Sequence, residues 1–153
     1  MKIKILIPVY NDWESVTKLL SEINNLSSNL GVQLSIIIVN DASNHDRSDE
    51  AMSLENIYSI KILNMKKNQG HARCIATGLK FINEKEDFDY VIPMDGDGED
   101  RPEEIKDFIN QIKASNGKPI VGLRVKRSES FFFQICYKMH KMITTTFTGK
   151  TIK

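Results

Sequence analysis

The sequence has few of the residues that form disulfide frameworks or structural metal sites. Its two cysteines, Cys74 and Cys136, are far apart and do not have the spacing of zinc ligands. Its three histidines are scattered along the chain. This composition argues against a disulfide-stabilised secreted module and against a zinc domain, so we expect reduced thiols and a cytoplasmic protein.

Long hydrophobic runs and a strong net charge are also absent. No apolar stretch approaches the roughly 20 residues that a membrane-spanning helix needs. The first residues lead into a strand-like segment without the apolar region and cleavage site of a secretory leader. The net charge of +1 gives no general argument for nucleic-acid binding. We therefore expect a protein that binds no nucleic acid and is soluble or, at most, attached to a membrane surface.

Three familiar ligand-binding motifs are missing. The sequence has no Walker lysine motif, and Pro8-Val9-Tyr10 stands where a dinucleotide-binding chain has its glycine-rich turn. A calcium-binding EF-hand loop that starts at Asp95 would need a glycine at position 100 and a glutamate at 106, where the chain has Asp100 and Lys106. Any ligand site must therefore be built differently.

The chain length and composition are those of an ordinary globular domain. With 153 residues and 41% hydrophobic content, residues 1–153 suit a single domain with a full core. The basic residues are unevenly placed, because 124–153 holds seven Lys or Arg against the single acid Glu129. This last segment is also rich in aromatic residues.

Strand-like and helix-like segments alternate along the chain. Short apolar runs predict strands over 3–9, 34–39, 60–63, 90–94 and 118–123. Helical spacing of apolar residues predicts a first helix through Trp13, Val16, Leu19, Leu20, Ile23 and Leu26, a second through Ala72, Ile75, Ala76, Leu79 and Ile82, and a third through Ile105, Phe108, Ile109 and Ile112. The third is expected to carry Pro102 in its first turn, and a last helix is expected over about 130–147.

This alternation predicts an α/β fold with a doubly wound, mostly parallel sheet and helices on both faces. Right-handed crossovers favour the strand order 3-2-1-4-5, which places the first and fourth strands side by side. Ligands of such sheets bind beyond the carboxyl ends of the strands, at the point where the strand order reverses.

An acidic cluster follows the predicted fourth strand. Asp95-Gly96-Asp97 comes directly after the apolar run, with Glu99 and Asp100 close behind. One interpretation is a site for a hard divalent cation, because carboxylate oxygens are the ligands that such ions prefer. The alternative is a solvated acidic turn, which acids and glycines form readily.

Two further polar clusters fall at neighbouring strand ends. Pro8-Val9-Tyr10-Asn11-Asp12 follows the first predicted strand, and Asn40-Asp41 follows the second. The joint placement of three polar clusters at one edge of the sheet favours a ligand site over an isolated acidic turn.

These motifs, in this order and spacing, resemble the nucleotide-sugar half of family 2 glycosyltransferases with the GT-A fold. The motifs are Ile7-Pro8-Val9-Tyr10-Asn11-Asp12, Val39-Asn40-Asp41-Ala42-Ser43, Asn68-Gln69-Gly70-His71-Ala72-Arg73 with Gly78, and Met94-Asp95-Gly96-Asp97. The subgroup that looks nearest contains dolichyl-phosphate mannose synthase and bacterial polyprenyl-phosphate sugar transferases.

The resemblance implies a role for each matching residue. Pro8, Tyr10, Asp12 and Asp41 would line the nucleoside pocket, Arg73 would meet the diphosphate or the acidic cluster, Gly96 would let the backbone approach the sugar, and Asp95, Asp97 and Glu99 would hold Mg²⁺ or Mn²⁺. The expected partner is a nucleotide-diphosphate sugar linked to UDP or GDP. The expected acceptor is a polyprenyl phosphate, which would place the protein at the inner face of a membrane.

The sequence departs from the subgroup in two ways. The subgroup usually has Asp-Ala-Asp-Leu-Gln, whereas Gly96, Gly98 and Glu99 make this loop more flexible and one charge more acidic. Family members also continue into an acceptor half, whereas this chain stops at Lys153. Either the natural protein continues and this chain is a part of it, or the chain binds the donor without transferring sugar.

Two questions stay open at this point. The segment 130–147 is either an amphipathic helix that lies on an anionic membrane or a helix whose partner half is missing, and we favour the second. The expected activity is metal-assisted, inverting sugar transfer. Its rivals are a catalytically silent nucleotide-sugar-binding module and a magnesium-dependent phosphoryl-transfer or receiver-like α/β domain.

Overall fold

The computed structural model contains a parallel four-stranded sheet with helices on both faces, as the sequence predicted. The structure describes residues 1–45, 54–115, 117–122, 139, 142 and 146. The chain divides into two compact units, Met1–Lys118 and Pro119–Lys153, and the whole sheet belongs to the first unit.

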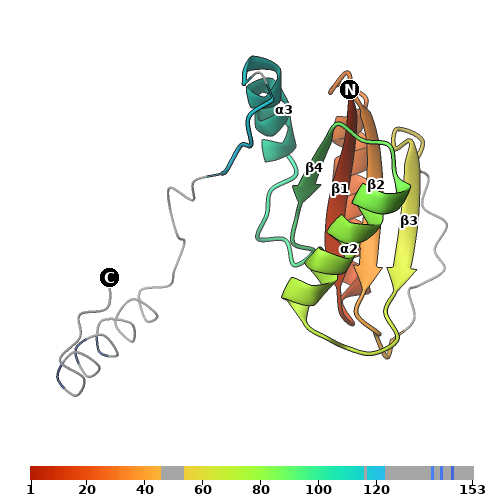
Figure 1. The fold of residues 1–153 in the computed structure, drawn as a ribbon, viewed down its shortest axis with the longest axis vertical. Helices are drawn as coiled ribbons and strands as arrows, with labels where there is room; N and C mark the ends of the chain where they lie inside the picture. The colour runs from red at the N-terminus through yellow and green to blue at the C-terminus, as the bar shows by residue number, and fades with distance from the viewer. Residues whose placement is uncertain (46–53, 116, 123–138, 140–141, 143–145, 147–153) are drawn as a thin grey trace. The chain divides into compact units, whose positions relative to one another are not determined.

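The helices and strands with defined bounds in the described residues follow one another along the chain (Figure 1). They are β1 (Lys2–Val9), α1 (Trp13–Ser27), β2 (Gln33–Asn40), β3 (Ser59–Asn64), α2 (His71–Lys85), β4 (Tyr90–Pro93) and α3 (Glu104–Ala114). The strand order is β3-β2-β1-β4, and every neighbouring pair is parallel. This order confirms the first four positions of the predicted arrangement and places β1 and β4 side by side.

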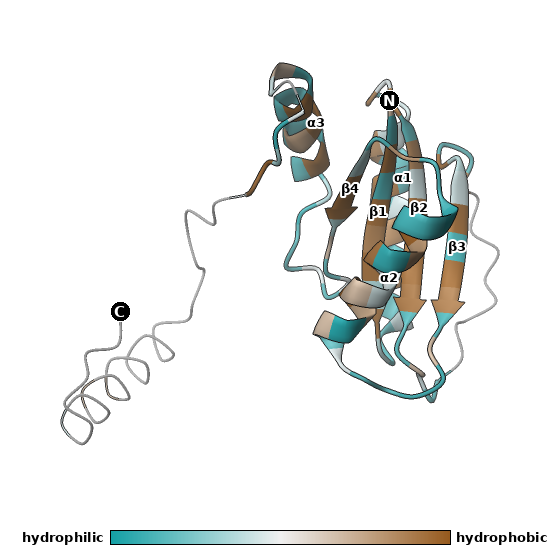
Figure 2. Cartoon of the chain, in the orientation of Figure 1, coloured by the Kyte–Doolittle hydropathy of each residue, from teal (hydrophilic) through white to brown (hydrophobic). Residues whose placement is uncertain are grey.

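The centre of the sheet is formed by β1 and β2. Their register runs from Lys2 opposite Gln33 to Val9 opposite Asn40. Both strands carry continuous apolar runs because both of their faces are covered, which is typical of parallel sheets. Figure 2 shows this pattern as hydrophobic colour along the two strands.

One face of the sheet is covered by α1. Asp12 caps the helix by accepting a hydrogen bond from the backbone N–H of Ser15 at 3.2 Å. The predicted inward face is confirmed, since Trp13, Val16, Leu19, Leu20 and Ile23 are buried.

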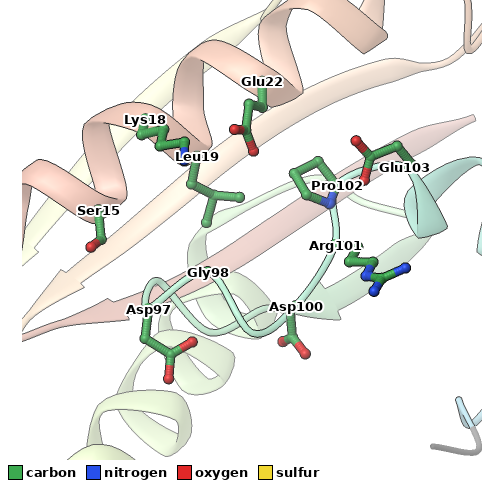
Figure 3. A pocket seen from close by; sticks show the side chains of 10 residues that line it. All are labelled: Ser15, Lys18, Leu19, Glu22, Asp97, Gly98, Asp100, Arg101, Pro102 and Glu103. Carbon is green, nitrogen blue, oxygen red and sulfur yellow. The ribbon is translucent and has the colours of Figure 1, made fainter. Parts of the chain in front are cut away.

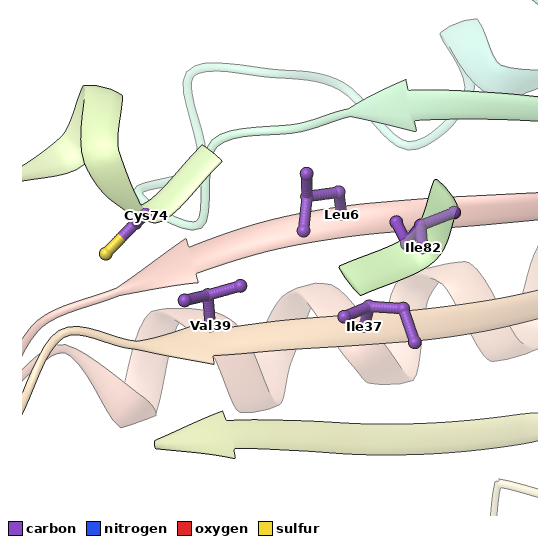
Figure 4. Close-up of a cluster of buried hydrophobic side chains, with 5 residues drawn as sticks. All are labelled: Leu6, Ile37, Val39, Cys74 and Ile82. Atoms are coloured by element: carbon purple, nitrogen blue, oxygen red, sulfur yellow. The ribbon is translucent and has the colours of Figure 1, made fainter. Parts of the chain in front are cut away.

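The other face is covered by α2. Cys74 and Ile82 of this helix form a buried cluster with Leu6, Ile37 and Val39 of the sheet (Figure 4). The predicted inward face of this helix was largely wrong. Leu79 is 40% exposed, and the buried residues are Cys74, Gly78 and Ile82. Gly78 explains the difference, because a Cβ there would lie 2.3 Å from Leu6 Cδ1, so the helix backbone itself approaches β1.

A partly buried ion-pair network, in which the Lys61 side chain is 49% exposed, links the carboxyl end of α2 to the sheet. Glu86, which follows the helix, lies 2.9 Å from Lys4 Nζ and 2.5 Å from Lys61 Nζ. The side chains of Glu86 and Lys4 are only 7% and 8% exposed. The hydrogen bonds from Lys61 and then Lys4 hold the pKa of the Glu86 carboxyl below its usual value.

Of three predictions about the later elements, one is confirmed and two were wrong. α3 buries Ile105, Ile109 and Ile112 as expected, but Pro102 precedes the helix cap instead of lying in the first turn. The predicted strand over 118–123 was wrong, because residues 117–122 form no strand and Val121 is 88% exposed. Pro119 lacks the backbone N–H that pairing in the middle of a sheet requires.

The predicted last helix over 130–147 lies mostly outside the described residues. Met139, Met142 and Thr146 are described, and all three are helical. Among the helices that the structure describes, none has the length and apolar character needed to cross a membrane.

Candidate functional site

The loops after β1 and β2 are joined by hydrogen bonds at the carboxyl edge of the sheet. The backbone N–H of Asn11 donates to Ser43 Oγ at 2.9 Å, and the backbone N–H of Asn44 donates to Asn11 Oδ1 at 2.7 Å. The ladder itself ends nearby, where the N–H of Asp41 donates to the carbonyl of Val9 at 2.8 Å. The first two predicted clusters therefore form one connected surface.

Asp41 connects this surface to the start of α2. Its carboxylate is 3% exposed and accepts the backbone N–H of Gln69 at 2.8 Å and that of Gly70 at 2.7 Å. Gly70 adopts a positive φ of 88°, which glycine tolerates. Asp41 therefore holds the turn that begins α2, a contact that the sequence did not predict.

The start of α2 lies next to the acidic loop. His71, its first residue, places Nε2 3.5 Å from Asp95 Oδ1. Arg73, which was expected to meet the diphosphate or the acidic cluster, donates instead from Nη1 to Gln69 Oε1 at 2.9 Å. The cationic side chain beside Asp95 in the described part of the chain is therefore that of His71, once it is protonated.

The acidic loop is organised by its own backbone. The N–H of Asp95 donates to Asp100 Oδ2 at 2.8 Å, and the N–H of Glu99 donates to Asp97 Oδ1 at 2.9 Å. Partial burial raises the pKa of the Asp95 carboxyl; His71 opposes this effect, and the negative charges of Asp100, Asp97 and Glu99 add to it. The loop thus gathers negative charge that a cation would offset.

Gly96 is placed by packing against the strand end. A Cβ at this position would lie 2.8 Å from Val16 Cγ2, 3.3 Å from Ile7 Cγ2 and 3.4 Å from the carbonyl oxygen of Pro8. The structure therefore gives this glycine a packing reason, and close approach to a sugar stays a prediction.

The remaining expected nucleoside residues surround the end of β1. Tyr10 is 46% exposed, so its ring is accessible for stacking. Pro8 is half-buried in β1, and Asp12 is the exposed cap of α1. Trp13 is buried as predicted and donates from Nε1 to the carbonyl of His45 at 3.1 Å.

The carboxylates of the acidic loop suit a metal ion that is coordinated by both protein and substrate better than an ion that is coordinated by protein alone. Among the described residues, no three histidine, cysteine or carboxylate side chains converge as a metal site. Magnesium, however, is usually held by one or two carboxylates together with substrate phosphates and water. Asp95 and Asp97, at least partly exposed on one loop, fit that arrangement.

A cavity of about 450 Å³ adjoins the acidic loop (Figure 3). It is lined by Ser15, Lys18, Leu19 and Glu22 of α1 and by Asp97, Gly98, Asp100, Arg101, Pro102 and Glu103. Of the site residues predicted from the sequence, Asp97 alone lines it among those described. This cavity is therefore distinct from the nucleoside crevice expected at the ends of β1 and β2.

Two contacts of the site were not predicted from the sequence. The bonds from Asp41 to the amides at 69–70 and the approach of His71 to Asp95 join segments that are far apart in the chain. The only sequence signal was the position of Asn68-Gln69-Gly70-His71 before a predicted helix, in a sheet whose strand ends share an edge.

Residues 4–151 match the family model described as Glycosyl transferase family 2. The match covers nearly the whole chain, which therefore belongs to this family.

Solved structures of TarS from S. aureus share the fold. TarS 1–349 is 20% identical, with 84% of this chain and 39% of that chain covered at a TM-score of 0.59. Its complex with UDP-GlcNAc is 17% identical, with 88% and 38% covered at 0.55, and its complex with UDP is 19% identical, with 88% and 40% covered at 0.58. The chain thus spans at most 40% of the length of these proteins.

Proposed function

We propose that the chain is the donor-binding part of a glycosyltransferase that uses a nucleotide-diphosphate sugar linked to UDP or GDP. The family membership supports sugar transfer in general. Complexes of TarS with UDP and UDP-GlcNAc show that a protein of this fold binds such nucleotides.

One observation carries the proposal: a continuous chain of contacts joins the ends of β2 and β4. Asp41 holds the amides of Gln69 and Gly70, the next residue is His71, and His71 lies 3.5 Å from Asp95. A nucleoside near Tyr10 and a diphosphate near Asp95 would therefore bind to parts of one connected edge. This connection supports a site in which the nucleoside and the diphosphate of one nucleotide sugar bind along the same edge of the sheet.

The roles of the side chains follow from their chemistry. Tyr10 offers a ring face to the base, and Asp41, Asp12 and Pro8 surround the nucleoside position. His71 and Arg73 lie in the first turn of α2, and the diphosphate would bind beside this turn. We assign Asp95 and Asp97, with Glu99 beside them, to an ion of Mg²⁺ or Mn²⁺, which would disperse negative charge on the departing diphosphate as a Lewis acid.

The proposed reaction is an inverting displacement. An acceptor oxygen attacks the anomeric carbon, the bond to the diphosphate breaks, and its electron pair leaves with the nucleoside diphosphate. A polyprenyl phosphate acceptor, as in the subgroup that the sequence resembles, would need no general base. A membrane contact through 130–147 would bring the protein to such an acceptor.

Turnover separates this proposal from its rivals. The full chain is expected to bind a UDP- or GDP-sugar in the presence of Mn²⁺, and release of free nucleoside diphosphate on addition of a polyprenyl phosphate would show that this chain also transfers sugar. Nucleotide binding without release would favour the silent binding module. Failure of every nucleotide to bind would remove the proposed function and leave the phosphoryl-transfer alternative.

A further inference from the structure

We infer that Asn11 and Ser43 are positioning residues for nucleoside binding, an inference that rests on the proposed function. Their side chains join the loops after β1 and β2, which carry Tyr10 and Asp41. We call the hydrogen bonds from Asn11 N–H to Ser43 Oγ and from Asn44 N–H to Asn11 Oδ1 the loop clasp.

The clasp fixes the peptide that follows Tyr10. The N–H of Asn11 belongs to the peptide group between Tyr10 and Asn11, so its 2.9 Å bond to Ser43 Oγ restrains the backbone on the carboxyl side of Tyr10. Asn11 adopts a left-handed φ of 59°, which asparagine tolerates better than most residues. The direction in which the Tyr10 side chain leaves the backbone therefore depends on Asn11.

The loop clasp lies beyond the last backbone hydrogen bond between β1 and β2. The ladder between β1 and β2 ends with the bond from Asp41 to Val9, whereas Asn11 Oδ1 reaches Asn44 at 2.7 Å and His45 at 3.4 Å. Ser43 is itself held, since its N–H donates to Asn40 Oδ1 at 2.9 Å. These bonds order the loop tips, where a ligand would bind.

A base binds more tightly to an exposed ring whose backbone is already held in place, because less conformational entropy is then lost on association. Tyr10 is 46% exposed. The clasp therefore contributes to binding without touching the nucleotide.

The test is calorimetric titration of the full chain with UDP and GDP at about 0.5 M salt, where added charges are largely screened. Asn11→Gly keeps the left-handed backbone and removes the acceptor, and we expect it to weaken binding about tenfold. Ser43→Ala is expected to weaken binding about fivefold. Asn11→Asp keeps the acceptor and the backbone preference, so its affinity is expected within about threefold of the parent.

A double-substitution cycle separates positioning from general stability. In a Tyr10→Ala background, Asn11→Gly is expected to cause no further loss of affinity. Thermal unfolding of each variant reports whether it is folded. An undiminished loss in that background, or parent-like binding by both Asn11→Gly and Ser43→Ala, would overturn the inference while the proposed function stands. A parent chain that binds neither nucleotide overturns both.

Discussion

Val16 on α1 and Gly96 in the acidic loop pack so closely that no side chain fits between them. A Cβ on Gly96 would lie 2.8 Å from Val16 Cγ2, inside the distance that carbon atoms tolerate. Val16 is 1% exposed, so its side chain has little room to move. Gly96 therefore lets the acidic loop pack directly against α1 and the end of β1.

Gly96→Ala is expected to lower the free energy of unfolding by about 1–3 kcal/mol, because the new methyl group overpacks the contact with Val16. Val16→Ala in the same chain makes room for that methyl group. The double variant is therefore expected to lose about 1 kcal/mol less unfolding free energy than the sum of the losses of the two single variants. Urea denaturation measures all three variants, and strict additivity would refute the contact.

Asp41→Ala is expected to cost about 3 kcal/mol of stability, because the backbone N–H groups of Gln69 and Gly70 lose a charged acceptor that is itself buried. Asp12→Ala is the matched comparison. Asp12 is also a carboxylate that accepts a backbone N–H, but it is an exposed helix cap, worth about 1 kcal/mol. Equal losses in the two variants would contradict the role of Asp41 in holding the start of α2.

The network around Glu86 predicts a stability loss in acid. The pKa of Glu86 is lowered from 4.5 in the folded chain, so its contribution is fully present above that value and is lost as the pH falls through the lower, folded pKa. Glu86→Gln should cost about 2 kcal/mol at neutral pH and flatten the acid side of the stability profile.

Glu84→Gln is the control for that experiment. Glu84 lies 3.9 Å from Lys80 on the exposed surface of α2, and such pairs contribute less than about 1 kcal/mol. If Glu84→Gln lost as much unfolding free energy as Glu86→Gln and had the same pH profile, the burial of Glu86 would not explain its contribution to stability.

Cys74 should be unreactive in the folded protein. Its thiol is 1% exposed, and burial, followed by the negative charge of Asp41, raises its pKa to about 11. At pH 8 it is therefore almost entirely protonated, and the thiolate is the reactive form. In a Cys136→Ser background, a disulfide reagent should modify the chain only after denaturant is added; rapid modification of the native chain would contradict the burial.

The strands at the centre of the sheet could be predicted closely from the sequence. The apolar runs at 3–9 and 34–39 differ by one residue or less at each end from β1 and β2, because strands that are buried on both faces leave a continuous signal. From these strands the edge that carries Tyr10, Asp41 and Asp95 follows through general rules of parallel sheets.

The orientation of α2 and the strand at 118–123 could not be predicted in this way. The apolar periodicity predicted that Leu79 is buried and contained no signal from Gly78. The helix backbone approaches β1 closely at Gly78, and this approach decides which face of α2 meets the sheet. A run of apolar residues at 118–123 does not reveal whether a pairing partner exists. Similarly, the contact between His71 and Asp95 depends on the exact position of α2.

The most direct test of the central claim is titration of the full chain with UDP- and GDP-sugars, with and without Mn²⁺. We expect one of these donors to bind, to bind more tightly with Mn²⁺, and to lose that gain in Asp95→Ala and Asp97→Ala. Absence of binding by every donor, or binding unchanged in both variants, would contradict the claim that the acidic loop is the metal side of a nucleotide-sugar site.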